Sequence, residues 1–345
     1  MTTTDRERLP GLDLRRFVSW FDGEHPGGRS ADLTASVVAG GRSNLTYVVT
    51  DGTRRWVVRR PPLGHVLATA HDMAREYRVI SALRATDVPV PATYGLCEDA
   101  DVLGAPFYVM EHVEGTPYRW AHELAKLGPE RTAAIGNRLV DVLAKLHTVD
   151  PASVGLADFG RPEGFLARQV RRWKKQLDAS YSREIPGIRQ LHEGLAVDPP
   201  ETSEPAIVHG DYRLDNVLVD SGDRIAAVLD WEMATLGDPL ADVALLTVYQ
   251  RSSGAGLGDV VATVTEAPGW PSEAELLQRY ADLSGRDLSH LGFHIALAAF
   301  KLAVILEGIH YRHVHGQTVG AGFDQIGQMV EPLVAIGLDA LKEKH

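Results

Sequence analysis

The sequence contains almost no cysteine and no excess of positive charge. Cys97 is the single cysteine in 345 residues, which excludes a disulfide framework and any zinc site built on cysteines. Lysine and arginine number 35 against 46 aspartates and glutamates, and the net charge is −11. A general nucleic-acid binder needs a broad basic face, so the composition argues against nucleic acid as a partner. Cys97 itself is expected to be a buried strand residue.

Targeting signals and long hydrophobic runs are also missing. The first ten residues, MTTTDRERLP, lack the apolar core of a secretory signal and are expected to form a loose tail. The longest apolar stretch lies near residues 295–306, and Lys301 interrupts it. We judge this stretch too short and too charged to span a bilayer. The expectation is a cytoplasmic protein, monomeric or homodimeric, without a membrane partner.

Familiar nucleotide-binding and hydrolase signatures are absent as well. There is no G-x-x-x-x-G-K-[ST] and no G-x-S-x-G motif. Gly254, Gly256 and Gly258 form G-x-G-x-G without a preceding strand, so a dinucleotide site is not expected there. The histidines of HYRHVH (310–315) do not fall on one helix face, and we expect no metal at them.

The order of patterns along the chain predicts an α+β protein with two lobes. Strand patterns and one helix occupy the first third, and helical patterns dominate after Gly115. The expected strands are 33–39, 45–50, 54–60, 92–97 and 107–112, and the expected helices are 70–84, 129–147, 165–177, 273–283, 290–311 and 323–341. A strand-rich island at 206–229 interrupts the helices. We predict an N-terminal lobe of residues 1–112 and a C-terminal lobe of residues 113–345.

The island carries the strongest chemical signal. An apolar strand leads into His209-Gly210-Asp211, Asn216 follows five residues after Asp211, and a later apolar strand delivers Asp230 at its end. Carboxylate and amide oxygens are ligands that Mg²⁺ prefers, so Asn216 and Asp230 are candidate metal ligands. Asp211 is then free to orient a substrate hydroxyl and accept its proton.

This arrangement resembles the catalytic apparatus of the eukaryotic-type protein kinases, where H-R-D-x-x-x-x-N supplies the base and one metal ligand and a later Asp holds Mg²⁺. H-G-D at 209–211 and D-W-E at 230–232 resemble the aminoglycoside phosphotransferase and choline kinase branch. The segment LDWEMATLGDPLADVA (229–244) is most similar to the subfamily that includes kinase-like domains fused to acyl-CoA dehydrogenases. The resemblance runs from about residue 30 to the C-terminus. It implies a protein-kinase-like bilobal fold, with a small β-rich N-lobe and a larger, mainly helical C-lobe.

The resemblance also implies ATP and Mg²⁺ as cofactors and a small-molecule hydroxyl as the phosphate acceptor. ATP would bind the N-terminal lobe at the loop that contains Gly40, Gly41, Ser43 and Asn44, where the glycines would let backbone N–H groups approach phosphates. The backbone of a hinge between the two lobes would contact the edge of the adenine ring. The expected hinge residues are Met110, Glu111, His112 and Val113. A D-F-G triplet at 158–160 precedes the catalytic loop and is interpreted as an ordinary loop.

The third strand departs from the family pattern because it carries arginine where the family has a phosphate-anchoring lysine. Arg59 falls at the matching position, and its guanidinium could fork onto phosphate oxygens. Alternation places Arg59 and Arg60 on opposite faces, and the sequence leaves open which of them contacts phosphate. Glu76, in the following helix, is the expected partner of the inward arginine.

Four residues around the catalytic loop receive supporting assignments. Arg213 either neutralises charge on the transferred phosphoryl group or is an exposed arginine paired with Asp215. His209 is expected to hold the loop backbone by hydrogen bonds. Asp238 is expected to cap a helix that Pro239 begins, and Asp242 to support the loop.

The acceptor is the least determined part of the prediction. RQVRRWKK (168–175) is either a solvated basic helix face or a docking site for an anionic substrate such as a coenzyme A thioester. The candidate substrate contacts are Arg168, Arg172, Trp173, Trp231 and Arg312. A hydroxyacyl-CoA or similar anionic metabolite is preferred slightly over an aminoglycoside, because an aminoglycoside is positively charged and would require an acidic pocket.

Two rival interpretations remain. Arg59 motivates a nucleotide-binding or scaffold protein that has lost turnover. The second rival interpretation is a protein kinase. The H-G-D loop argues against it, and so does the lack of a recognisable A-P-E segment after Asp230.

Overall fold

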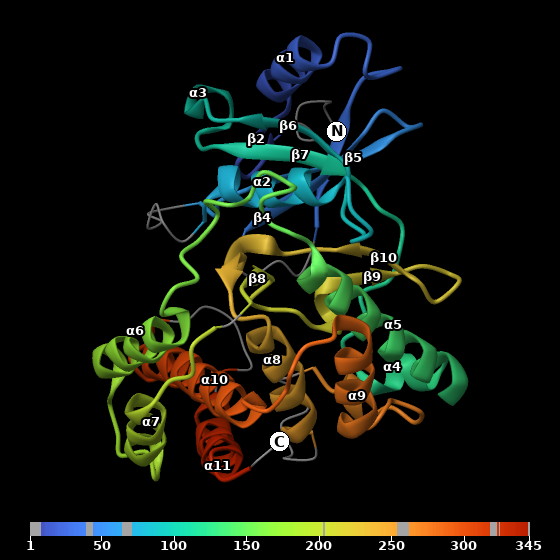
Figure 1. Ribbon diagram of the computed structural model, residues 1–345. Coiled ribbons are helices and arrows are strands. Elements are labelled where there is room, and N and C mark those ends of the chain that lie inside the picture. The colour runs from blue at the N-terminus through green and yellow to red at the C-terminus, as the bar shows by residue number, and fades with distance from the viewer. Residues whose placement is uncertain are drawn as a thin grey trace. The chain divides into compact units, whose positions relative to one another are not determined.

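The computed structural model describes residues 8–38, 44–63, 71–202, 204–253, 262–317, 323 and 325–343. The chain forms two compact units, Met1–Gly115 with Ala226–Ala234, and Thr116–Ile225 with Thr235–His345. The first is strand-rich and the second mainly helical (Figure 1), which confirms the α+β class and the kinase-like order of elements. The segment 226–234, which the prediction placed in the C-terminal lobe, groups with the first unit.

The first unit is built on a five-stranded antiparallel sheet with strand order β3-β4-β5-β7-β6. Its strands are β3 (Thr34–Val37), β4 (Leu45–Thr50), β5 (Arg55–Arg60), β6 (Thr93–Cys97) and β7 (Phe107–Glu111). Each lies within two residues of its predicted bounds. Pro61 and Pro62 end β5 because proline cannot continue the ladder.

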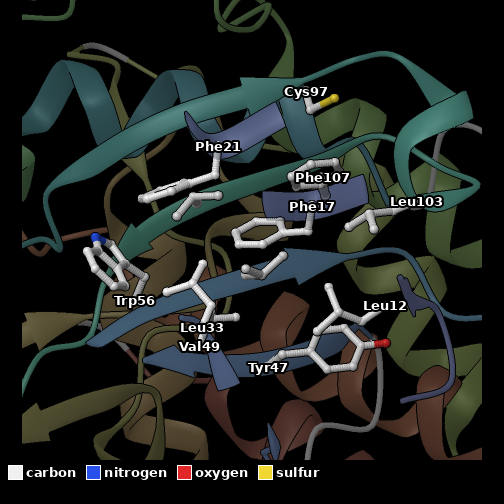
Figure 2. Close-up of a cluster of buried hydrophobic side chains, with 12 residues drawn as sticks. Leu12, Phe17, Phe21, Leu33, Tyr47, Val49, Trp56, Cys97, Leu103 and Phe107 are labelled. Carbon is white, nitrogen blue, oxygen red and sulfur yellow. The ribbon is translucent and has the colours of Figure 1, made fainter. Parts of the chain in front are cut away.

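Two helices of this unit use different faces of the sheet. Helix α1 (Leu14–Glu24) buries Phe17 and Phe21, which pack against Phe107 and Trp56 in the apolar core drawn in Figure 2. Helix α2 (Met73–Leu83) contacts β6 and β7 and carries Glu76 toward the face opposite this core. Cys97 is buried in the core, as predicted.

The N-terminal segment is more ordered than predicted. Strands β1 (Arg8–Leu9) and β2 (Leu12–Asp13) pair, and the Tyr47 hydroxyl donates to the Pro10 carbonyl. The expectation of a loose tail is therefore wrong for residues 8–10, and residues 1–7 lie outside the described residues. A short helix, α3 (Ala100–Leu103), precedes β7.

The second unit contains most of the helices. They are α4 (Ala121–Ala125), α5 (Pro129–Thr148), α6 (Phe165–Ser180), α7 (Ile188–Val197), α8 (Leu240–Arg251), α9 (Glu273–Ser284), α10 (Leu291–Val314) and α11 (Val330–Ala340), with short 3₁₀ turns η3 (Val264–Glu266) and η4 (Ile326–Met329). The helix expected at 323–341 thus splits into η4 and α11. Helix α7 was not predicted.

Helix α10 lies at the centre of the second unit, against α6, α7, α8 and α11. By length and composition alone it could cross a membrane, with 24 residues and a mean hydropathy of 1.7 over its most apolar window. The judgement that this stretch is too short was wrong. The window is 67% buried inside the protein, which is the pattern of a core helix.

Short strands frame the motif loops. In the second unit β8 (Ala206–Val208) pairs with β11 (Thr235–Gly237), and the 3₁₀ turn η1 (Leu214–Asn216) leads into β9 (Val217–Val219). The chain then passes along β10 (Ile225–Val228) to η2 (Trp231–Met233). The Val228 N–H donates to the Pro89 carbonyl, which ties this passage into the first unit.

Candidate functional site

Arg59 is the centre of a buried ionic cluster in the first unit. Its Nε lies 2.9 Å from Glu76 Oε2, and its Nη2 lies 2.5 Å from Asp230 Oδ1 and 3.8 Å from Glu232 Oε2. Arg60 points to the other face of β5 and donates to the carbonyls of Gly11 and Leu103. Of the two arginines, the structure therefore directs Arg59 to the acidic residues, and Glu76 is its partner as predicted.

Neutral donors complete this cluster. The Asn44 amide donates to both Glu76 and Glu232, at 3.1 and 3.2 Å, and the Tyr108 hydroxyl donates to Glu76 at 3.0 Å. Burial raises the pKa of Glu76 above its ordinary value, and the positive charge of Arg59 opposes that rise. Burial also raises the pKa of Tyr108, so its hydroxyl keeps the proton that it donates. Tyr108 and Glu232 were not among the predicted site residues.

Asp230 has an uncommon backbone conformation. Its φ and ψ are 64° and 60°, the left-handed region that a side chain other than glycine rarely adopts. Such conformations cost free energy and persist where the surroundings impose them. Here the Arg59 ion pair and the following turn η2 hold Asp230 at the end of β10.

The remaining predicted nucleotide contacts fall in two places. Gly40, Gly41 and Ser43 lie outside the described residues. The expected hinge begins on β7, where Glu111 exchanges two hydrogen bonds with Ala92, the residue before β6. The Glu111 N–H donates to the Ala92 carbonyl, and the Glu111 carboxylate accepts from the Ala92 N–H. Met110 is buried, whereas His112 and Val113 are partly exposed beyond the strand.

The predicted catalytic loop, residues 209–216 of the second unit, is held by backbone hydrogen bonds to one buried carboxylate. Asp242 accepts from the His209 N–H at 2.6 Å and from the Gly210 N–H at 2.7 Å. The His209 ring is fully buried, and its Nδ1 accepts from the Asp211 N–H at 3.3 Å. His209 and Asp242 thus support the loop, as the sequence predicted.

Asp242 is itself part of a buried chain of polar groups. Its Oδ2 lies 3.3 Å from His147 Nε2, and His147 Nδ1 lies 2.8 Å from the Tyr280 hydroxyl. Burial lowers the pKa of His147, and contact with His147 and the loop N–H groups lowers the pKa of Asp242 although burial opposes it. The loop therefore rests on a neutral histidine and an ionised aspartate.

Asp211 and Asn216 lie together in this loop. The Asn216 amide nitrogen donates to the Asp211 carbonyl at 2.8 Å and to Asp211 Oδ2 at 2.9 Å. These bonds use the nitrogen of Asn216 and leave its carbonyl oxygen for another partner. The Asp211 side chain is 32% exposed, so its carboxylate is both oriented and reachable from solvent.

Arg213 pairs with the carboxylates of its own loop. Its Nε lies 3.0 Å from Asp215 Oδ1 and 3.6 Å from Asp211 Oδ2, and its guanidinium lies over the Tyr249 ring. The predicted pairing with Asp215 is present, but the arginine is only 26% exposed. Burial raises the pKa of Asp215, and Arg213 opposes that rise.

Helix α8 begins one residue later than predicted, at Leu240. Asp238 accepts from the Leu240 N–H at 3.0 Å, so it does support this helix start. It also accepts from the Thr202 hydroxyl and lies 3.1 Å from His294 Nε2.

Lys301 was missed as a site residue by the sequence analysis, which treated it only as an interruption of an apolar stretch. Its Nζ donates to the Gly210 carbonyl at 2.8 Å and lies over the Trp173 ring, 5.8 Å from the centroid. A lysine within an otherwise apolar helix is the signal that could have found it.

The predicted substrate contacts have different surroundings. Arg168 donates to the carbonyls of Arg161 and Glu163, so it ties down the turn before α6. Trp231 is 1% exposed and donates to the Val228 carbonyl, so the structure gives it a packing role instead of a surface for a substrate. Trp173 is buried beneath Arg172 and Lys301, and Arg312 is exposed near the end of α10.

The expected Mg²⁺ ligands have the right chemistry, although they belong to different units. Asn216 presents a carbonyl oxygen, and Asp230 a carboxylate that is 27% exposed. Such hard oxygen donors suit a cation that keeps waters and substrate phosphates as its other ligands. Among the described residues, no three or more His, Cys, Asp or Glu side chains form a metal-binding group.

Comparison with known proteins agrees with this geometry. Residues 34–276 match the phosphotransferase enzyme family. The chain belongs to this family. A provisionally named aminoglycoside phosphotransferase from Ralstonia eutropha JMP134 has 33% identity to this family member and a TM-score of 0.83, over 96% of this chain and 99% of that protein. A thermostable mutant of aminoglycoside phosphotransferase APH(4)-Ia, solved with ADP and hygromycin B, matches at 18% identity and a TM-score of 0.62, over 94% of this chain and 97% of its own, which shows a shared fold.

Curated relatives of this phosphotransferase are longer proteins. Acyl-CoA dehydrogenase family member 11 of Gallus gallus is 36% identical over 90% of this chain and 40% of its own length, and member 10 of Mus musculus is 36% identical over 88% and 29%. The chain thus spans less than half of these relatives. The predicted resemblance to kinase-like domains fused to acyl-CoA dehydrogenases is confirmed.

Proposed function

We propose that this phosphotransferase moves the γ-phosphoryl group of ATP to a hydroxyl of a small molecule, with Asp211 as the residue that orients that hydroxyl. The observation that carries the proposal is the hydrogen bonding of Asp211. Asn216 holds its carboxylate at 2.9 Å, and Asp242 fixes the two preceding residues through the N–H groups of His209 and Gly210. A carboxylate held in this way is preorganised to meet a hydroxyl proton.

In the proposed step the acceptor oxygen attacks the γ-phosphorus as the bond to the bridging oxygen of ADP breaks. The hydroxyl proton passes to the Asp211 carboxylate. Asn216 and Asp230 would hold Mg²⁺, which neutralises charge on the transferred group. Arg59, fixed by Glu76, would contact nucleotide phosphates, and Arg213 would lie beside the reacting group.

The acceptor class is proposed from charge and from the relatives. A hydroxyacyl-CoA or similar anionic metabolite would suit the basic side chains of α6 and the curated relatives named for acyl-CoA dehydrogenation. An aminoglycoside is the alternative that the names of solved relatives suggest. The two differ in sign of charge, so a direct comparison separates them.

The test is transfer of labelled γ-phosphate from Mg–ATP to a panel of hydroxyacyl-CoA esters, aminoglycosides, choline and sugars. Asp211→Asn is expected to lower turnover about 10²- to 10⁴-fold and to leave nucleotide affinity within a few fold. Asp339→Asn, an exposed carboxylate paired with Lys342 on α11, is the matched control and should retain full turnover. Equal turnover in wild type and Asp211→Asn would refute the assignment.

One observation favours a second candidate, a nucleotide-binding protein without turnover. Arg59 replaces the family's lysine and is already engaged by three carboxylates. This candidate predicts saturable nucleotide binding with no transfer to any acceptor in the wild-type protein.

A further inference from the structure

Lys301 places a positive charge next to the catalytic loop without forming an ion pair with a described residue. Its single hydrogen bond among the described residues goes to the Gly210 carbonyl, and no carboxylate of those residues lies within 4 Å of its ammonium. A backbone carbonyl needs only one neutral donor, which glutamine could provide. A full charge at this position costs free energy, since burial lowers the pKa of Lys301.

A second cation shares the same aromatic platform. The Arg172 guanidinium lies 5.4 Å and the Lys301 ammonium 5.8 Å from the centroid of Trp173. Arg172 also forms no ion pair with the described residues, and its charge further disfavours protonated Lys301. Two cations beside one ring repel each other. Holding them together therefore lowers the free energy of unfolding of the protein without a ligand. Neighbouring Lys174, by contrast, is neutralised by Asp178 at 2.6 Å.

The position of the pair relates it to the reaction. Gly210, whose carbonyl Lys301 binds, is joined directly to Asp211, and Gly210 has a φ of 84° that turns its carbonyl toward α10. One N–H of the ammonium is used there, which leaves two donors beside the peptide that carries Asp211. The charges facing the ammonium are those of Asp211 and Asp242 in or behind the loop and Arg172 on α6.

We propose that Lys301 is a specificity-determining residue of the acceptor site, and that with Arg172 it binds an oxygen anion of the acceptor, a carboxylate or a phosphate, beside the hydroxyl that Asp211 engages. The inference rests on the proposed function for the identity of that hydroxyl. The anion site itself is a property of the second unit alone and is measurable without turnover.

The test is calorimetric titration of the full chain with inorganic phosphate and, separately, with acetate, which distinguishes the two sources of the anion. Wild type is expected to bind at least one of them at a single site. Lys301→Met and Arg172→Gln should each weaken that binding at least tenfold, because each removes a charge-assisted contact. Lys301→Arg should retain affinity within about threefold, since it keeps the charge. Lys174→Met, on the same helix as Arg172 but already neutralised by Asp178, should bind like wild type.

Repeating the titration with saturating Mg–AMP-PNP separates acceptor from nucleotide. If the anion still binds, the site belongs to the acceptor. If the nucleotide displaces the anion and Lys301→Met weakens nucleotide binding, Lys301 contacts the γ-phosphate and the inference is overturned. It is equally overturned if wild type binds neither anion, or if Lys301→Met binds as well as wild type. A protein that fails to bind nucleotide but shows Lys301-dependent anion binding would refute the proposed function and keep this site.

Discussion

Arg59 shows why an arginine can stand where the family has lysine. Its guanidinium has donors at several positions of a rigid plane, so one side chain contacts Glu76 through Nε and Asp230 through Nη2. A lysine ammonium is a point charge and would not bridge the two carboxylates in this way. The substitution therefore keeps a positive charge at the expected place and adds a direct link to Asp230.

Removing this charge should be costly. Arg59→Met would leave the buried carboxylate of Glu76 and the partly buried carboxylate of Asp230 without this cation, and the free energy of unfolding is expected to fall by about 3–5 kcal/mol. Arg55→Met is the control on the same strand, because Arg55 pairs with Glu114 at an exposed site, and should cost about 0–1 kcal/mol. Urea unfolding measures both. Similar losses in the two variants would show that the cluster adds little stability.

The buried His147–Asp242 pair predicts weaker folding in acid. Both groups have a pKa lowered in the folded protein, so below the ordinary histidine value of 6.5 the unfolded chain binds protons that the folded chain does not. The free energy of unfolding should then decrease as pH falls from 7 to 5, by at most about 1.4 kcal/mol per pH unit from His147. The stabilisation that comes from ionised Asp242 is lost only at lower pH, as the pH falls toward the lowered pKa of this carboxyl group.

Urea midpoints measured at pH 7, 6 and 5 test this expectation. His147→Gln should show a shallower dependence on pH than wild type, whatever its stability at pH 7. His122→Gln, which alters an exposed histidine of α4, should keep the wild-type slope. If the urea midpoint of His147→Gln depended on pH as steeply as that of wild type, groups other than His147 would be responsible for the pH dependence.

At the scale of elements, strands and long helices were predictable because their patterns are local. The alternation of β5 was visible in the sequence, but it allowed two orientations. Helix α1 covers one face with Phe17 and Phe21, and Glu76 of α2 lies on the other, so only the packing reveals that Arg59 meets Glu76. Contacts between distant segments, such as Lys301 with Gly210, leave no mark in local periodicity.

Two missed helices did carry a readable signal. Leu14, Phe17, Val18 and Phe21 follow the i, i+3, i+4, i+7 spacing of an apolar helix face, and Asp13 caps the helix start by accepting from the N–H groups of Arg15 and Arg16. In α7, Ile188, Leu191 and Leu195 have related spacing after Gly187. These helices were overlooked although their sequences predict them.

Close helix packing in the second unit gives a prediction about glycine. In α5, a Cβ at Gly136 would lie 2.6 Å from the Pro271 ring, which cannot rotate away, so Gly136→Ala is expected to destabilise by about 1–3 kcal/mol. Gly308 in α10 has room, with the nearest atom at 3.8 Å, and Gly308→Ala should stabilise by about 0.4–1 kcal/mol. Thermal or urea unfolding of both variants checks the opposite signs. If Gly136→Ala instead raised the free energy of unfolding, Pro271 and the loop before α9 would have to move aside without cost.

At the scale of the whole molecule, the passage 226–234 belongs with residues far from it in sequence. Its Val228 N–H donates to Pro89, and Asp230 pairs with Arg59. In native-state hydrogen exchange, amides of 226–234 are therefore expected to open with those of β5 and β7. Amides of α10, which packs against α6, α8 and α11, should follow the second unit. Joint exchange of 226–234 with α10, apart from β5 and β7, would contradict this division.

This passage also sets the order in which the protein can mature during synthesis. The first unit lacks Asp230, and hence one partner of Arg59, until residue 234 has left the ribosome, and 110 residues separate Gly115 from Ala226. At about 5–20 residues per second, the ribosome takes roughly 6–22 s to make that stretch. Throughout this interval the nascent N-terminal sheet carries Arg59 and Glu76 without the aspartate. A chaperone would therefore have its longest access to the unfinished first unit during translation.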